Sequence, residues 1–307
     1  MGMNLKQLIY FRKAIETGNI TKAASELHVA QTALGMQIRN LEEELGVDLL
    51  ERHSRGVRAT PSGELLNTYA EDILARLEEM KRAVRARAGA AQETLRLGVT
   101  PSIVRLVGDA ILTEFAQMLP GVSLHIVEDF SFILMRQLSQ GELACALTYS
   151  PDIDQRFQRR ALLEEELFLM TADKDDDTGP VAFRDAVSRE LALTGKQDVV
   201  ARALGAMAER LGVTVNVAYQ VQSIRAVKNL VAKGVAATVM PYGAAESELR
   251  KHEFRARHIV SPPVVRTLVA VTPRDSVGVG VPAGFDAFVD AIADRLHAAE
   301  GPITRRL

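Results

Sequence analysis

Residues 18–46 read GNITKAASELHVAQTALGMQIRNLEEELG, and this stretch decides the fold of the N-terminal region. Gly18-Asn19 ends one helical pattern, and Thr21 is expected to cap the short helix that follows. After a turn at residues 28–30, a second helix runs from Gln31 to Gly46, with apolar side chains at helical spacing. These apolar positions are Leu34, Ile38, Leu41 and Leu45. The stretch therefore predicts two helices joined by a tight turn.

The sequence on either side of this stretch completes a small domain. Upstream, Leu8, Phe11 and Ile15 keep helical spacing and predict a first helix. Downstream, residues 48–58 are typical of a small hairpin with Ser54-Arg55-Gly56 at its tip. Three helices and a hairpin indicate a winged helix-turn-helix, in which the helix after the turn enters the major groove of DNA. A plain helical bundle with a polar outer face is the alternative.

Side chains opposite the buried stripe of the 31–46 helix are the candidates for DNA contact. Glutamine can pair with adenine, and arginine can pair with guanine or phosphate. On the helix, the outward or leading positions are Gln31, Thr32, Gly35, Met36 and Arg39. The hairpin adds three arginines with no acid among them, which can hold phosphates without reading sequence. These wing or backbone candidates are Arg52, Arg55 and Arg58.

Residues 60–88 are predicted to form one long helix that begins at Thr60-Pro61. Its apolar side chains recur at steps of three and four residues, close to a heptad seam. They are Leu66, Tyr69, Ile73, Leu77, Met80 and Val84. Because the seam extends well past a small helical domain, we expect it to pair two copies of the chain; packing on its own domain is the alternative. The predicted DNA-binding domain is residues 1–62, and the predicted linker helix is residues 63–92.

From residue 93 the chain alternates between predicted strands and helices. The order strand, helix, strand, helix, strand occurs twice, which predicts two α/β lobes built on mostly parallel sheets. Strands near residues 166–171 and 264–272 are expected to carry the chain out of the first lobe and back. We place lobe I at residues 93–163 and 266–307, and lobe II at residues 164–265.

Polar side chains and one aromatic ring follow the carboxyl ends of these strands, close to the starts of helices. Ligands of open α/β sheets bind at that edge, where free backbone N–H groups favour an anion. We therefore predict a site for a small carboxylate, or a similar aromatic or anionic metabolite, between the lobes. Its candidate residues are Thr100, Ser102, Phe130, Thr148, Thr194, Gly195, Gln222 and Ser223. Helix capping alone is the alternative for Ser102 and Ser223.

The composition excludes several classes of protein. A chain of 307 residues with 47% hydrophobic and 25% charged residues is not mainly disordered. No apolar run reaches membrane-spanning length, the N-terminus lacks an apolar signal segment, and Cys145 is the single cysteine, so we expect a cytoplasmic protein. The histidines show no metal spacing, and no nucleophile–base pair can be assembled. We assign no catalytic residue, metal or cofactor.

The spaced residues from Phe11 to Gly63 resemble the DNA-binding domain of LysR-type transcriptional regulators. The similarity is carried by Gly18-Asn-Ile-Thr21-Lys-Ala-Ala24, Leu27-His-Val-Ala-Gln31-Thr-Ala-Leu34, Gln37-Ile-Arg-Asn-Leu41-Glu-Glu-Glu-Leu-Gly46 and Thr60-Pro-Ser-Gly63. Two positions depart from the family pattern: Thr32 stands where proline is frequent, and Gly35 stands where a DNA-contacting serine is usual. The resemblance implies that the major-groove set is Gln31, Thr32, Met36, Gln37 and Arg39.

The resemblance extends to the architecture of the whole chain. It implies an N-terminal all-α winged helix-turn-helix, a long dimerising linker helix and a C-terminal α/β two-lobed domain like a periplasmic binding protein. The implied partners are double-stranded DNA with an inverted-repeat operator, a small-molecule effector between the lobes, and further copies of the chain in a homodimer and homotetramer. RNA polymerase is an implied partner if the chain activates transcription.

Two other classes of function are compatible with parts of the sequence. The two lobes alone fit a solute-binding protein for transport, although the N-terminal winged domain argues against it. An enzyme such as a hydrolase acting in the cleft would need a catalytic pair or metal cluster. The sequence leaves open the effector, the operator and the direction of regulation.

Overall fold

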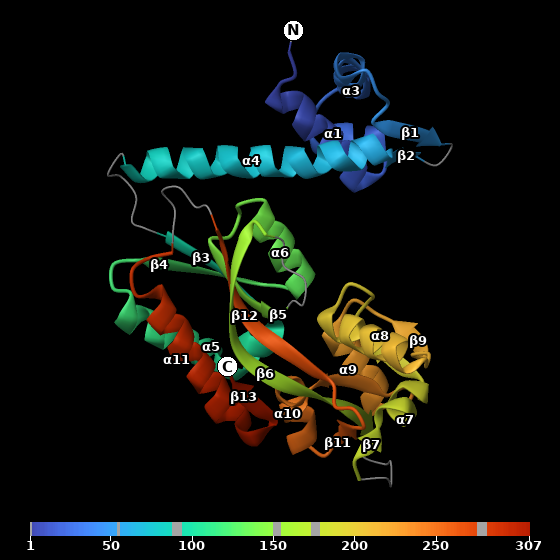
Figure 1. Ribbon diagram of the computed structural model, residues 1–307, viewed down its shortest axis with the longest axis vertical. Helices are drawn as coiled ribbons and strands as arrows, with labels where there is room; N and C mark the ends of the chain where they lie inside the picture. Colours follow the sequence, from blue (N-terminus) through green and yellow to red (C-terminus); the bar gives the residue numbers. More distant parts are fainter. Residues whose placement is uncertain (1, 54–55, 88–93, 150–154, 173–178, 275–280) are drawn as a thin grey trace. The chain divides into compact units, whose positions relative to one another are not determined.

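The computed structural model describes residues 2–53, 56–87, 94–149, 155–172, 179–274 and 281–307 (Figure 1). The predicted hairpin tip at Ser54-Arg55 and the predicted junction at residues 92–93 lie outside these residues. The chain divides into two compact units, of which the first ends at Arg85 and takes in Ser139–Gly141, and the second contains the rest. The exact domain boundaries given above stay predictions.

The first unit is a winged helix-turn-helix followed by a long helix. Its elements are α1 (Leu5–Thr17), α2 (Ile20–Glu26), α3 (Gln31–Leu45), β1 (Leu50–His53), β2 (Gly56–Ala59) and α4 (Pro61–Arg87). The antiparallel β1–β2 pair is the predicted wing. The amide of Val57 donates to the Gly18 carbonyl at 2.9 Å, which ties the wing to the end of α1. The expected three helices and hairpin are confirmed.

Two local expectations in this unit are wrong. Asn19, and not Thr21, caps α2, because its side chain accepts hydrogen bonds from the amides of Thr21 and Lys22. Leu45 is 41% exposed and does not continue the buried stripe of Leu34, Ile38 and Leu41. The reason is that α3 ends directly after Leu45, where Gly46 takes a left-handed conformation with a φ of 68°.

Lobe I of the second unit is built on three parallel strands in the order β4-β3-β5. Its elements are β3 (Thr94–Val99), α5 (Pro101–Met118), β4 (Ser123–Glu128), α6 (Ser131–Ser139), β5 (Cys145–Tyr149) and α11 (Phe285–Glu300). Apolar side chains of α5 and α11 pack on one face of the sheet, and those of α6 pack on the other. The predicted strand–helix order is confirmed here.

Two strands run between the lobes. β6 extends without interruption from Phe157 to Ala172, and β12 extends from Val265 to Pro273. They pair antiparallel with each other, and β12 also pairs antiparallel with β5. The sheet is therefore mixed and not mostly parallel, because strands that return between two lobes must run in opposite directions. The outgoing strand begins about nine residues before the predicted 166–171 segment, at Phe157.

Lobe II surrounds the far end of β6. Its elements are β7 (Val181–Ala182), α7 (Phe183–Ser188), β8 (Leu191–Leu193), α8 (Val199–Leu211), β9 (Val217–Gln220), α9 (Ile224–Ala232), β10 (Thr238–Pro241), α10 (Tyr242–Arg250) and β11 (Phe254–Val260). A short 3-10 turn (Gly301–Ile303) and β13 (Thr304–Arg306) bring the chain end back to β6. The sequence did not predict α7, α10, β11 or β13.

Gly63 is required where α4 leaves the wing. A Cβ at this position would meet the backbone oxygen of Leu49, which already accepts a hydrogen bond from the amide of Thr60 at 3.0 Å. Gly63→Ala is expected to lower the free energy of unfolding of the first unit by about 2 kcal/mol, since overpacking against backbone cannot relax cheaply. Urea unfolding followed by circular dichroism measures this change.

The matched control is Gly35→Ala on α3, where an added Cβ meets nothing within 4 Å. This variant should gain about 1 kcal/mol, because alanine favours helix over glycine. Equal behaviour of the two variants would show that the contact between Gly63 and Leu49 does not restrict the start of α4.

Candidate DNA interface and ligand cavity

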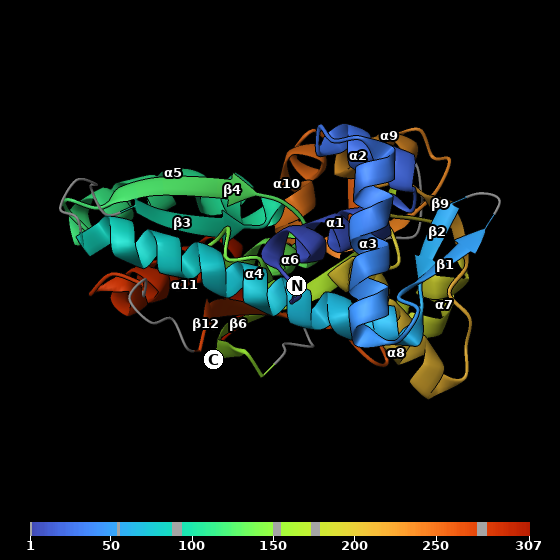
Figure 2. The same ribbon diagram turned by 90° about the horizontal axis from the view of Figure 1, so that it is seen from above.

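Helix α3 lies beside the β1–β2 hairpin, as Figure 2 shows, and most of its exposed side chains are polar. Its inner side chains Leu34, Ile38 and Leu41 are fully buried against α1 and α2. This packing turns the predicted base-contacting residues outward. Gln31, Thr32, Met36 and Arg39 are exposed, with Met36 at 56%, and Gln37 is half-buried. The structure therefore brings the predicted set onto one accessible helix surface.

The wing carries two of its three predicted arginines on described residues. Arg52 on β1 and Arg58 on β2 are both exposed, and Arg58 lies opposite Glu51 in the strand register. Within the described residues, Arg39, Arg52 and Arg58 make no hydrogen bond or ion pair, so their guanidinium groups are available to phosphates. The remaining candidate, Arg55, lies outside the described residues and stays a prediction.

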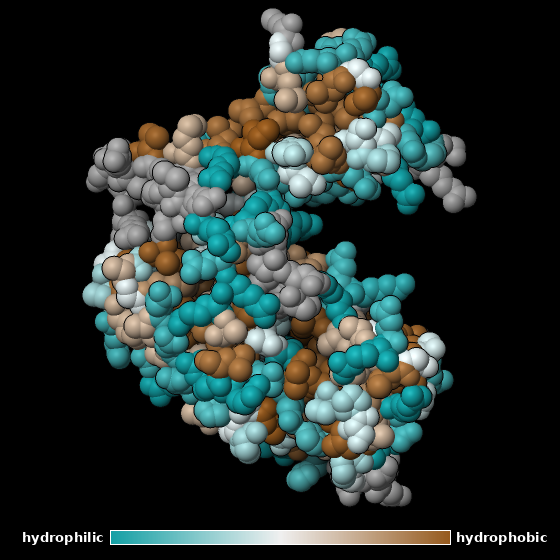
Figure 3. All heavy atoms as spheres, in the orientation of Figure 1, coloured by the Kyte–Doolittle hydropathy of each residue, from teal (hydrophilic) through white to brown (hydrophobic). Residues whose placement is uncertain are grey.

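The predicted apolar seam of α4 is largely exposed. Tyr69, Ile73, Met80 and Val84 are 60%, 42%, 55% and 66% exposed, and Leu65 adds a further apolar side chain at 61%. Figure 3 shows the apolar surface that gathers along this helix. An exposed stripe of this length on one helix favours contact with another protein surface.

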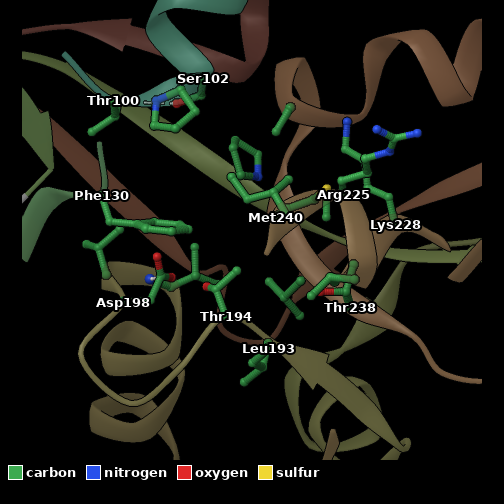
Figure 4. Close-up of a pocket in the computed structure, with 18 of the residues that line it drawn as sticks. Thr100, Ser102, Phe130, Leu193, Thr194, Asp198, Arg225, Lys228, Thr238 and Met240 are labelled. Carbon is green, nitrogen blue, oxygen red and sulfur yellow. Dashed lines mark hydrogen bonds between the residues drawn. The ribbon is translucent and has the colours of Figure 1, made fainter. Parts of the chain in front are cut away.

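The second unit contains a cavity of about 580 Å³ between its lobes (Figure 4). One wall comes from the start of α5 and the β4–α6 loop in lobe I, with Thr100, Ser102 and Phe130. The opposite wall comes from the β8–α8 loop and α9 in lobe II, with Thr194 and Lys228. The cavity lies where the strand-end rule for open sheets places a ligand, and its size suits a small metabolite.

Four of the eight predicted ligand residues line this cavity. They are Thr100, Ser102, Phe130 and Thr194. Of the others, Thr148 is fully buried in β5. Gly195 and Gln222 lie within two residues of lining residues in the sequence but are not part of the lining. Ser223 caps α9 by accepting a hydrogen bond from the amide of Ala226 at 3.3 Å. Thr148, Gly195, Gln222 and Ser223 are thus outside the cavity lining, and their contact with a ligand stays a prediction.

Three helices begin at the walls of this cavity. They are α5 at Pro101, α8 at Val199 and α9 at Ile224. Helix starts carry free N–H groups and partial positive charge, which attract anions. Two of them are already capped by side chains, since the Asp198 carboxylate accepts from the amide of Val200 at 2.9 Å and the Ser223 hydroxyl accepts from the amide of Ala226. Burial raises the pKa of Asp198, so this carboxyl holds its proton more readily than a solvated one.

The cavity is also lined by charged side chains that the sequence analysis did not select. Among the described lining residues, the basic ones are Arg105, Arg225, Lys228 and Arg266, and the acidic ones are Glu128, Asp198 and Glu248. Lys228 pairs with Glu248 at 2.9 Å, and burial lowers the pKa of the lysine despite that partner. Arg225 is exposed and has no hydrogen-bond or ion-pair partner within the described part of the chain.

Arg266 is the most deeply buried of these cations. Its Nε donates to Glu165 Oε2 at 2.6 Å, its terminal nitrogen donates to Ser102 Oγ at 3.1 Å, and its guanidinium stacks 3.6 Å from the centre of the Tyr149 ring. Burial opposes the charge on Arg266, but Glu165 and Tyr149 outweigh it and raise the arginine pKa. In the sequence, Arg266 is the one charged residue of the apolar segment VVRTLVAV, and its partner Glu165 lies in the segment LLEEELFL.

Other chemistry finds little support in the structure. Cys145 is fully buried, and burial raises the pKa of its thiol, which agrees with a packing role. Within the described ranges, no three His, Cys, Asp or Glu side chains gather as they would around a metal ion. No described helix is both long enough and apolar enough to cross a membrane.

Two family models match the chain and together cover most of it. Residues 5–64 match the bacterial regulatory helix-turn-helix protein of the lysR family, and residues 88–297 match the LysR substrate binding domain. The chain belongs to the LysR family of transcription regulators. The expected fold class is confirmed by these matches, and the LysR chain is a DNA-binding regulator with an effector-binding domain, not an enzyme.

Individual relatives agree with this assignment. The nitrogen assimilation regulatory protein nac of Escherichia coli is 30% identical over 251 residues, which is 80% of each chain. The oxidized form of Corynebacterium glutamicum OxyR has the same fold, with a TM-score of 0.52 and 22% identity over 99% of this LysR chain and 96% of the other. Full-length CbnR complexed with its target DNA has a TM-score of 0.53 at 20% identity, over 97% and 100%.

Arg58→Ala is expected to weaken DNA binding by a similar factor for every sequence, because a phosphate contact positions the protein without reading bases. The slope of log K against log salt should fall by about 1 in magnitude, as one phosphate contact is lost. A salt titration of fluorescently labelled duplex measures it. Arg210→Ala, an exposed arginine on α8, is the control and should leave the slope unchanged. An unaltered slope in Arg58→Ala would remove the wing from the phosphate contacts.

Gln31→Ala is expected to relax the base preference at one operator position and to leave binding to unrelated DNA unchanged. A bidentate contact between glutamine and adenine contributes about 1–3 kcal/mol of discrimination. Binding to a panel of singly substituted operators measures this effect. The matched control is Gln117→Ala at an exposed position of α5. A base-preference profile identical to that of the wild-type protein would show that Gln31 reads no base.

Proposed function

We propose that this LysR-family protein binds an inverted-repeat operator as an oligomer and that a small anionic metabolite in the cavity controls its activity. The observation that carries the proposal is the combination of a free polar face on α3 with a cation-bearing cavity in the second unit. The first reads DNA and the second responds to a ligand. A ligand changes DNA binding only if its affinity differs between two arrangements of the oligomer.

The exposed seam of α4 supports pairing of two chains. Two copies of the Tyr69–Ile73–Met80–Val84 stripe would cover each other, and each copy would contribute one α3 helix. Two-fold symmetry then requires operator half-sites that are inverted and separated by whole helical turns. We propose a homotetramer made of two such dimers, with RNA polymerase as a further partner if the protein activates transcription, acting in the cytoplasm where the DNA is accessible.

The walls of the cavity support a carboxylate as the effector group. The start of α5 supplies the amide and the hydroxyl of Ser102, since the amides of Ile103 and Val104 already donate to the Thr100 carbonyl. Arg266 lies within hydrogen-bond distance of the Ser102 hydroxyl. Phe130 adds an apolar surface, as Figure 4 shows between Thr100 and Asp198. A compact ligand with a carboxylate and an apolar or aromatic body fits both features.

The test has two arms that use the full chain. The first arm measures, at low ionic strength, whether the protein retards the migration of DNA fragments taken from beside its own coding region. If it binds none of these fragments when metabolites are supplied, the proposed DNA binding is contradicted. Thermal unfolding with small aliphatic and aromatic carboxylates tests the effector. A carboxylate present at about 100 times its Kd should stabilise the protein by about 2.7 kcal/mol.

Ser102→Ala should weaken binding of the carboxylate found in that screen by about tenfold, because a hydrogen bond to a charged group contributes about 1.5–3 kcal/mol. The concentration dependence of the thermal shift measures the change. Thr113→Ala is the control, since its hydroxyl bonds only to carbonyls of its own helix, those of Asp109 and Ala110. If both variants bind as tightly as the wild-type protein, the ligand does not contact the start of α5.

A further inference from the structure

The buried Glu165 and the half-buried Glu300 form a pair of carboxyl groups behind the cavity wall. Glu165 lies on β6 directly opposite Arg266 on β12 in the strand register, and it is completely buried. One of its oxygens, Oε2, accepts from Arg266. The other, Oε1, is buried and has no hydrogen-bond partner among the described residues. A buried carboxylate oxygen without a donor is costly, so a donor is required at this place.

Glu300, the last residue of α11, interacts with the Glu165 carboxyl and, like the hydroxyl of Tyr149, can supply that donor. Its Oε1 accepts from the amide of Gly243 on α10 at 3.2 Å, which leaves the second oxygen available to carry a proton. Burial, and then the neighbouring charge of Glu165, raise the pKa of Glu300 to about 9. Glu300 therefore holds its proton at neutral pH, because two adjacent carboxyl groups away from bulk water cannot both ionise cheaply.

The other groups around Glu300 leave this assignment intact. On the strands, these groups are Arg266 of β12 and Tyr149 of β5, which both interact electrostatically with Glu300. On the helices, they are the Gly243 amide of α10, Arg105 and Leu106 of α5 next to Gly243, and His297 of α11 itself. Arg266 is committed to Glu165 and Ser102, Arg105 donates to the Gly243 carbonyl at 3.2 Å, and His297 is bonded to Thr304 at 2.8 Å.

The position of Gly243 shows that the contact is tight. A Cβ there would meet both the Glu300 carboxyl and the side chain of Leu106. Only glycine lets the first turn of α10 approach so closely. The pair is thus connected on one side to Arg266, which lines the cavity, and on the other side to the helix that follows β10 of lobe II.

We propose that Glu165 and Glu300 are positioning residues that share one proton and hold Arg266 against the Ser102 hydroxyl as the anion-binding cation of the cavity. With one proton present, the guanidinium is opposed by a single carboxylate, and the cavity wall is not negative. Loss of that proton would leave two carboxylates behind one guanidinium and repel an anionic effector. The inference deepens the proposed effector role of the cavity and rests on it only for this last step.

The first test is the pH dependence of thermal unfolding of the full chain. A folded-state pKa above the ordinary value of 4.5 means that the contribution of Glu300 to wild-type stability falls as the pH rises from about 5 to about 9 and then levels off. Glu300→Gln keeps the neutral shape: its carbonyl can accept from Gly243, and its amide can donate to Glu165. The melting temperature of this variant, relative to the wild-type protein, should therefore rise steadily across that interval.

The control is Glu209→Gln, which removes the same charge from an exposed position on α8. Its melting temperature should differ from that of the wild-type protein by an amount independent of pH in this interval. If Glu300→Gln behaves in the same way, or is less stable than the wild-type protein by a constant amount, Glu300 is ionised in the folded protein and the proposal is wrong.

The second test follows Arg266 itself. In the full chain labelled with ¹⁵N-arginine, the Nε–H signal of Arg266 is identified by its loss in Arg266→Lys. Glu300→Gln should leave this signal in place, and Glu300→Ala should shift or broaden it. An unmoved signal in Glu300→Ala would show that Glu300 does not position Arg266. Neither test uses DNA or effector, so failure here is distinguishable from failure of the proposed function.

Discussion

The effector-binding unit depends on one constraint, the buried guanidinium of Arg266 on β12. It is paired with Glu165 on the neighbouring strand β6. Arg266 is only 8% exposed, and Glu165 opposite it is completely buried. Removing one member of a buried pair costs about 3–5 kcal/mol, because the other charge is left without compensation. The two strands must therefore keep their register, and the cavity wall that contains Arg266 keeps its shape with them. The integrity of this unit and the proposed recognition of an anionic ligand both depend on the contact between Arg266 and Glu165.

The local sequence was sufficient for most of the fold. The stripe Leu34–Ile38–Leu41 predicted α3 and, by exclusion, its outward face, because a helical period fixes which side chains are buried. It was insufficient where several local signals compete: Asn19 and Thr21 are both good caps, and only the structure shows which one accepts from the free amides. Helix α10 was not predicted, because its residues, YGAAESELR, include a single large aliphatic side chain, Leu249.

The ligand cavity could be predicted only in part. Thr100, Ser102, Phe130 and Thr194 follow from a rule about strand ends, which needs no knowledge of distant contacts. Arg266 and Glu165 are separated by about a hundred residues and become neighbours only through the register of β6 and β12. A charged residue in a strand is normally assigned to the solvent face by alternation. Its burial here is decided by a partner that the local sequence does not reveal.

The single strand β6 has a mechanical consequence. It pairs with β12 and β13 at one end and with β10 and β11 at the other, so the same sixteen residues serve as a structural member of both lobes. The lobes are therefore joined by paired strands, although the ladder between β6 and β12 has one register shift, between Leu268 and Val269. A change in the angle between the lobes would have to be accommodated along these paired strands. Neither lobe can be separated from the other without cutting β6. A shortened effector-binding domain would therefore expose an unpaired sheet edge, which favours aggregation.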